Sequence, residues 1–220
     1  MSAPQPIVYF VINGIHTNPS KANAWTDEAA TWLNLNTPDH VKAEKFEYYT
    51  TAVTRWWKQG KRARELATKA LAYQSQGYQV RMIGHSNGCD LIARVILCRY
   101  KSEAKEPAVR VHVAHLIAPA AQDEDFAMIA EQSLARQIHI YGSRNDKALQ
   151  AATLSQKALG WLGLGFGSLG LRGAELEHRY PARVQDHSRD HYGHSTWVGG
   201  LALTGTLTEI LRNDGLNPKS

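Results

Sequence analysis

The chain has 220 residues, of which 43% are hydrophobic and 20% are charged, and its formal net charge is +5. These values are typical of a globular protein and exclude a disordered or low-complexity chain. The positive charges are scattered rather than clustered, so we do not expect nucleic-acid binding.

The sequence carries no pattern that predicts export or membrane insertion. The first six residues lack a basic region followed by an apolar core, so no secretory signal is predicted. No uninterrupted apolar stretch reaches the ~18 residues of a membrane span. Cys89 and Cys98 are predicted on one helix, where nine residues separate them by ~13 Å, too far for a disulfide. We therefore expect a cytoplasmic protein with reduced cysteines, although signal-independent export would leave the same pattern.

Strand-like apolar runs alternate with helical patterns along the chain. The predicted strands are Ile7–Ile12, Lys45–Tyr49, Gln79–Ile83, Val109–Ile117, Gln137–Tyr141 and Ala182–Gln185. The predicted helices are Ala22–Leu33, Arg55–Gln74, Cys89–Tyr100, Asp125–Ala135, Lys147–Leu159 and Ser195–Leu211. This alternation predicts one α/β domain over residues 1–220, a doubly wound, mostly parallel sheet of about six strands with helices on both faces and no large cap domain. Ligands of such sheets bind beyond the carboxyl ends of the strands.

The segment Gly84-His85-Ser86-Asn87-Gly88 joins the third predicted strand to the third predicted helix. A Gly-x-Ser-x-Gly at such a junction is typical of a nucleophile elbow, a sharp turn that lifts the serine hydroxyl above the sheet. A Cβ at either glycine would collide with the neighbouring strand or helix. Ser86 is therefore the candidate nucleophile.

The element order and the elbow resemble the α/β-hydrolase superfamily from Ile7 to Leu211. The resemblance implies a catalytic order of serine, acid and histidine along the chain. His194 lies after the last predicted strand and before the final helix, where similar hydrolases carry their base, and His191 and His187 are alternatives. The histidine would take the proton of the serine, whose hydroxyl is too weak an acid to attack unaided.

Asp146 directly follows a predicted strand, as the acid of this superfamily usually does. It would bind the second imidazole nitrogen of the base and determine the tautomer. An aspartate in this position is also typical of a helix N-cap. Asp123 and Asp125 are the alternative acids, one strand earlier.

The first predicted strand ends in Asn13-Gly14-Ile15, which is similar to the His-Gly oxyanion loop of the superfamily with asparagine in place of histidine. The resemblance implies that the amides of Ile15 and Asn87 hold the oxyanion. The other interpretation is that Asn13-Gly14 forms an ordinary turn.

Imidazole and carboxylate groups that suit zinc are grouped at the end of the chain, in Asp186, His187, Asp190, His191 and His194. Because the triad already uses His194 and the segment lacks an apolar helical face, we expect neither a metal nor another cofactor.

Two segments are candidates for substrate contact. The glycine-rich run 160–171, with Trp161 and Phe166, is either an apolar flap over the site or a buried loop. The run 55–64, with Trp56 among basic residues, fits either an anionic lipid headgroup or a solvated helix face.

The sequence thus predicts a serine hydrolase that cleaves small-molecule or lipid esters, an esterase or lipase, with contact to a membrane surface as one interpretation. A thioesterase, acyltransferase or amidase would use the same triad, and a binding protein could retain the scaffold without turnover.

Overall fold

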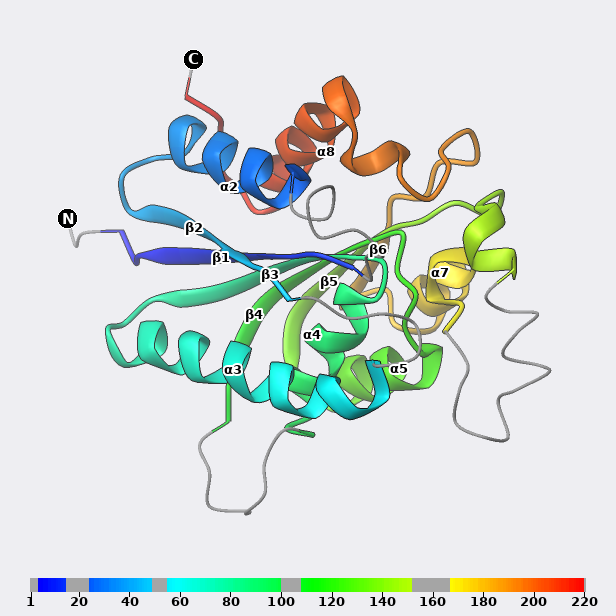
Figure 1. Ribbon diagram of the computed structural model, residues 1–220, viewed down its shortest axis with the longest axis horizontal. Helices are drawn as coiled ribbons and strands as arrows, with labels where there is room; N and C mark the ends of the chain where they lie inside the picture. Colours follow the sequence, from blue (N-terminus) through cyan, green and yellow to red (C-terminus); the bar gives the residue numbers. More distant parts are fainter. Residues whose placement is uncertain (1–3, 15–23, 49–54, 100–107, 152–166, 220) are drawn as a thin grey trace.

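The computed structural model describes residues 4–14, 24–48, 55–99, 108–151 and 167–219. Within these residues, six parallel strands form one sheet in the order β2-β1-β3-β4-β5-β6 (Figure 1). The strands are β1 (Ile7–Ile12), β2 (Val41–Phe46), β3 (Gln79–His85), β4 (Val111–Ile117), β5 (Ala135–Tyr141) and β6 (Val184–Asp186). The predicted doubly wound sheet is confirmed.

Helices cover both faces of this sheet, as predicted. In Figure 1, α2 (Ala24–Asn36) and α8 (Gly200–Asn213) lie above it. The helices below it are α3 (Arg55–Ser75), α4 (Gly88–Ile96), α5 (Asp123–Glu131) and α7 (Leu169–Arg179). A short 3₁₀ helix, Thr196–Val198, precedes α8, and residues 147–151 are also helical. No described helix is both long and apolar enough to cross a membrane.

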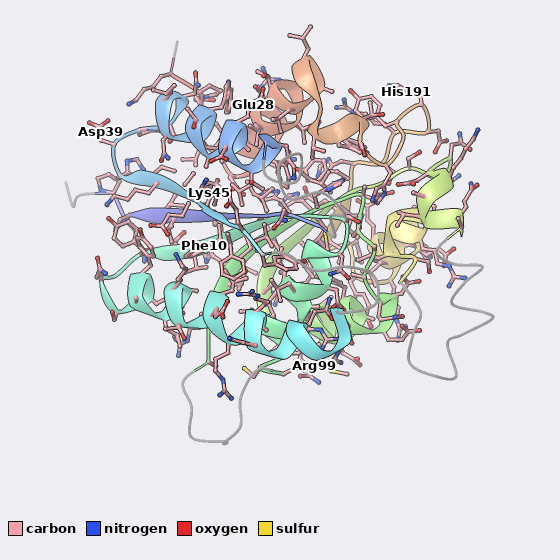
Figure 2. All side chains as sticks on the ribbon, viewed as in Figure 1. Phe10, Glu28, Asp39, Lys45, Arg99 and His191 are labelled. Carbon is pink, nitrogen blue, oxygen red and sulfur yellow. The ribbon has the colours of Figure 1, made fainter. Side chains whose placement is uncertain are left out.

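The central strands are apolar on both faces because helices cover both. All six residues of β1 are buried. Phe10 points down toward α3, where its ring meets the edge of Tyr73 with centroids 5.9 Å apart (Figure 2). Tyr9 faces the opposite way, in the core that β1 shares with α2 and α8. Continuous apolar runs are therefore the signature of this sheet, and they made its central strands easy to predict.

Strand β2 begins four residues and ends three residues earlier than the sequence predicted. The expected strand was Lys45–Tyr49, whereas the chain pairs Ile7 with Val41 and Ile12 with Phe46. As an edge strand, β2 alternates buried and exposed residues and carries lysine and glutamate on its open side. Phe46 is the last residue of β2, and Tyr48 is buried just beyond its end, so the predicted strand began too late.

Several helical predictions also need correction, including the predicted helix Asp125–Ala135, which is α5 over Asp123–Glu131 because Ala135 begins β5. Helix α4 ends at Ile96, so Cys98 lies beyond it in a turn with a φ of 57°. Cys89 and Cys98 are both free, but only Cys89 is buried. Helix α7 was not predicted, and the final predicted helix is split into the 3₁₀ turn and α8. The predicted helix Lys147–Leu159 extends into residues outside the described part.

The strand order changes direction between β1 and β3. The chain leaves β1 toward α2 on one face, and it leaves β3 toward α4 on the other. Ligands of open α/β sheets usually bind at the carboxyl ends of the strands where the order changes in this way. Gly14 follows β1 and Ser86 follows β3, so both lie at this position.

Candidate active site

Ser86 forms a sharp turn between β3 and α4. Its φ of 55° is in the left-handed region, which costs a non-glycine residue about 1 kcal/mol or more. Backbone hydrogen bonds hold this conformation, since Ser86 N donates to Ile117 O (2.9 Å) and Cys89 N donates to Ser86 O (3.1 Å). The turn leaves the Ser86 side chain partly exposed at the carboxyl end of β3.

The two glycines of the elbow allow close approach on both sides of the serine. A Cβ at Gly84 would lie 2.7 Å from Ile92 Cδ1 and 3.1 Å from Cys89 N. A Cβ at Gly88 would lie 2.6 Å from Asn13 O. The predicted need for glycine is therefore explained by α4 for Gly84 and by the end of β1 for Gly88.

A chain of hydrogen bonds joins the three side chains that the sequence singled out. His194 Nε2 lies 2.9 Å from Ser86 Oγ, and His194 Nδ1 lies 2.8 Å from Asp146 Oδ2. An ionised Asp146 accepts a hydrogen bond from Nδ1–H, so the imidazole proton stays on Nδ1 and Nε2 is free to accept a hydrogen bond from the serine hydroxyl. The structure thus brings together residues that are up to 108 positions apart in the sequence.

Asp146 is only 1% exposed, and it binds the helix that follows as well as the imidazole. Its Oδ1 accepts a hydrogen bond from Leu149 N (3.0 Å), which is the N-cap interaction considered above. Burial raises the pKa of Asp146, but its bond to His194 and the amides of Leu149 and Ala148 outweigh burial and hold the pKa below its ordinary value. The carboxylate is therefore ionised at neutral pH.

The two alternative acids, Asp123 and Asp125, contact residues other than His194. Asp125 forms a two-pronged ion pair with Arg99 (2.6 and 2.7 Å), on the side of α4 away from α8. Asp123 accepts a hydrogen bond from Ser168 (3.4 Å) and lines a separate hollow between α5 and α7. Burial raises the pKa of Asp123 to about 6. Only Asp146, of these three, is hydrogen-bonded to His194 in the described structure.

The alternative bases also have other contacts. His187 Nε2 lies 3.0 Å from His139 Nδ1, and the His187 ring stacks on Tyr141. His191 is exposed on the loop before α8, where its ring meets the edge of Tyr192 (Figure 2). Among the described contacts, the hydroxyl of Ser86 is reached by His194 alone of the three.

His85 has a role at the site that sequence reasoning missed. Its Nε2 donates to the backbone oxygen of His194 (2.9 Å), and the two rings lie 5.1 Å apart. Trp25 packs against its other side at 5.8 Å. The variable position of the elbow therefore supports the loop that carries the candidate base.

The loop after β1 reaches the nucleophile. A Cβ at Gly14 would lie 2.9 Å from Ser86 Cβ and 3.4 Å from Ser86 Oγ. The Asn13 side chain, buried where the superfamily has histidine, pairs with the backbone of Tyr48 on the neighbouring loop. Asn87 follows the nucleophile at the start of α4, whereas Ile15, the other predicted donor, lies outside the described residues.

The predicted substrate contacts fall largely outside the described part. Trp161 and Phe166 are not described, and neither is the side chain of Trp56 at the start of α3. The described end of the glycine-rich segment is buried, since a Cβ at Gly167 would overlap the backbone of Ala121 and Leu169 begins α7. Gly167 and Ser168 therefore pack against the loop after β4, and residues 169–171 form the first turn of α7 instead of a loop, while the rest of the glycine-rich segment lies outside the described residues.

A hollow of about 430 Å³ opens beside the candidate base. Its lining includes Asn145, Lys147, Asp190, His191 and His194. Across the described ranges, no three histidine, cysteine or acidic side chains are grouped so that they could hold a metal ion.

Solved structures share this fold at low sequence identity. An esterase from the planctomycete Thermogutta terrifontis with butyrate bound gives a TM-score of 0.58 at 14% identity, covering 98% of this chain and 86% of that one. An acetyl ester-xyloside bifunctional hydrolase from Caldicellulosiruptor lactoaceticus gives 0.51 at 13% identity, covering 98% and 85%. An uncharacterized protein from Bacillus cereus gives 0.59 at 10% identity, covering 97% of this chain and 61% of that one.

Comparison with curated proteins finds no match. A family model described as "Alpha/beta hydrolase of unknown function (DUF900)" matches residues 41–164, a range that includes the elbow and Asp146 and ends before His194. Because this match spans more than half of the 220 residues, the chain belongs to this alpha/beta hydrolase family.

Proposed function

We propose that the protein is a serine hydrolase that cleaves carboxylic esters through Ser86, His194 and Asp146. The observation that carries this proposal is the continuous hydrogen-bonded chain from the Ser86 hydroxyl to the buried Asp146 carboxylate, formed at a strained elbow. The fold shared with esterases is consistent with it but shows only the architecture.

The chemistry proceeds through an acyl-enzyme. His194 Nε2 takes the proton of Ser86 as Oγ bonds to the ester carbonyl carbon, and the carbonyl oxygen becomes the oxyanion. His194 then gives this proton to the alkoxide as the carbon–oxygen bond to the alcohol breaks. Water attacks the acyl carbon in the second half, with His194 taking its proton and returning it to Ser86.

The groups around Ser86 and His194 stabilise the charges that develop during these reaction steps. Asp146, held ionised, stabilises the imidazolium that forms in each half-reaction. The oxyanion would be held by the amide of Asn87 and, by resemblance, that of Ile15. We propose that the alcohol side of the substrate lies in the hollow beside His194, since His194 must reach the leaving oxygen.

Covalent labelling with a fluorophosphonate tests the proposal. A related esterase structure, from Thermogutta terrifontis, is phosphoramylated by tabun, which makes a phosphorus electrophile a suitable probe. We expect one label per native chain, none on Ser86→Ala, and full labelling of Ser75→Ala, which removes an exposed serine on α3.

A folded native protein that takes no label, or labelling that survives in Ser86→Ala, would contradict the proposal. After positive labelling, turnover of esters with graded acyl length would identify the substrate class. Added alcohols that divert the acyl group from water would indicate transfer instead of hydrolysis.

A further inference from the structure

Four buried polar side chains lie together beside the nucleophile elbow. They are Asn13 after β1, Tyr48 after β2, Gln59 in α3 and Asn87 in the elbow, and they are exposed by 0, 4, 2 and 0%. Polar groups are this deeply buried only when hydrogen bonds replace their contacts with water. We therefore expect hydrogen bonds among these side chains to explain why they are buried together.

Hydrogen bonds link the four into one network. Asn13 Nδ2 donates to Tyr48 O (3.1 Å), and Tyr48 N donates to Asn13 Oδ1 (3.3 Å). Asn87 Nδ2 donates to the Tyr48 hydroxyl (3.2 Å). Gln59 Nε2 donates to Asn87 Oδ1 (3.2 Å). Tyr48 is thus tied to the loop after β1 by its backbone and to the elbow by its hydroxyl.

The network joins the two backbone segments that flank the nucleophile. On one side, Asn13 precedes Gly14, whose backbone lies against Ser86. On the other side, Asn87 directly follows Ser86. A buried hydrogen-bonded network resists movement, because shifting one member breaks its hydrogen bonds in an environment that excludes water. Side chains outside the triad therefore fix the distance between these two backbone segments.

We propose that Asn13, Tyr48, Gln59 and Asn87 act through their side chains as positioning residues for the oxyanion site. Building on the ester hydrolysis proposed above, they hold the backbone after β1 and the amide after the nucleophile where negative charge develops in the transition state. This stabilisation acts in the transition state more than on the bound ester, so its loss lowers kcat and leaves KM nearly unchanged.

Tyr48→Phe is the sharpest variant, because it deletes one hydroxyl and leaves the backbone pair with Asn13 intact. We expect kcat to fall about 10-fold or more, since misplacement by a fraction of an ångström is costly in preorganised sites. Tyr73→Phe is the matched control. It deletes a hydroxyl that is hydrogen-bonded to Glu44, between α3 and β2, and should leave kcat unchanged.

A second pair of variants tests the connection through Asn87. Gln59→Met removes the donor to Asn87 Oδ1 with little change of volume. Because Gln59 and Tyr48 both act on Asn87, their effects on kcat should be less than multiplicative in the double variant. A Tyr48→Phe protein with kcat within twofold of native would overturn the proposal.

Amide nuclear magnetic resonance gives a readout that needs no turnover. The Gly14 and Asn87 amide signals should shift in Tyr48→Phe and stay in place in Tyr73→Phe, even if the native protein cleaves no ester. Unmoved amides in Tyr48→Phe would overturn the positioning role. Absence of fluorophosphonate labelling in the native protein would instead count against the hydrolase proposal, so the two failures are distinguishable.

Discussion

Asp146 meets two demands with its two carboxylate oxygens. Oδ2 accepts from His194 Nδ1, and Oδ1 caps the helix at residues 147–151 through Leu149 N. The cap holds the carboxylate against rotation, so the residue reaches His194 in a defined geometry. A structural role and a catalytic role therefore coincide in one side chain.

Asp146→Asn separates these roles. Asparagine is as good an N-cap as aspartate, so its oxygen can still accept from Leu149 and stability should change little. Its amide group would then donate to His194 Nδ1 and force the proton onto Nε2, which could no longer accept from Ser86. We expect kcat on a short-chain ester to fall by about 10³-fold or more, with the midpoint of thermal unfolding nearly unchanged.

The matched control is Asp125→Asn, which alters the alternative acid and its ion pair with Arg99. It should retain native kcat. Loss of activity in Asp125→Asn, or near-native kcat in Asp146→Asn, would show that the acid has been misassigned.

At the scale of elements, the elbow depends on contact between backbones. The first turn of α4 lies against the end of β1, where Gly88 faces the carbonyl oxygens of Ile12 and Asn13. Backbone atoms cannot rotate away as a side chain can, so added atoms at this point must displace the helix or the strand. The position of the nucleophile is thus coupled to the packing of α4 on β1.

Gly88→Ala should therefore destabilise the protein and disturb the site. The new Cβ would meet Asn13 O at 2.6 Å and Ile12 O at 2.8 Å. We expect a loss of about 1–3 kcal/mol in the free energy of unfolding and slower fluorophosphonate labelling of the folded fraction.

Gly205→Ala in α8 is the matched helical control, since a Cβ there has no neighbour within 4 Å. It should stabilise the protein by about 0.5–1 kcal/mol. Urea unfolding of both variants gives these values, and equal stability of Gly88→Ala and the native protein would refute the close contact.

At the scale of the whole molecule, a second polar cluster is buried between the sheet and α8. Asp214 accepts from Arg81 Nη1 (2.9 Å), His115 Nε2 (3.1 Å) and the Tyr9 hydroxyl. The ring of His139 stacks on that of His115 with centroids 4.8 Å apart. This cluster joins β1, β3, β4 and β5 to the residue that follows α8.

Titration of this cluster should make the fold sensitive to acid. Burial lowers the pKa of His139 from 6.5 to about 3, and the neighbouring His115 and His187 add to the effect. Burial likewise lowers the pKa of His187. For Asp214, burial raises the pKa, but His115 and Arg81 outweigh it and hold the pKa well below 3.8.

Whether stability rises or falls with pH depends on whether the folded or the unfolded state binds more protons. Below pH 6.5 the unfolded chain protonates a histidine that the folded protein keeps neutral, so stability falls as pH drops from 6.5 toward 3. Each such histidine contributes up to about 1.4 kcal/mol per pH unit. The contribution of Asp214 is present above 3.8 and is lost only below that value.

His139→Asn should flatten the dependence of stability on pH. Asparagine removes the titrating group and keeps a donor near the position of Nδ1. Urea unfolding from about pH 7.5 to about pH 4.5 measures the slope, and His178→Asn, which removes an exposed histidine on α7, is the control. A slope in His139→Asn as steep as in the native protein would mean that other groups dominate.

The sequence predicted those parts of the fold whose cause is local. The apolar runs of β1 and β3 are longer than any turn and shorter than a helix, so they identify central strands. The elbow combines two glycines with a strand and a helix within a few residues.

Strand β2 was misplaced because an edge strand needs only half its residues apolar. Helix α7 was missed because its glycines suggest a loop, although Gly170 and Gly173 serve close packing on Pro119 and Asp186.

The sequence by itself therefore determined the class of fold, the candidate nucleophile, and one acid and one base among several candidates. The tertiary structure decided which histidine reaches Ser86 and which aspartate binds that histidine, because those contacts join residues 48 and 108 positions apart in the sequence. It also revealed the network of Asn13, Tyr48, Gln59 and Asn87, whose members follow different strands or lie in a helix. Polar residues in loops have no periodicity that marks them as buried, so only the folded chain shows that they share one site.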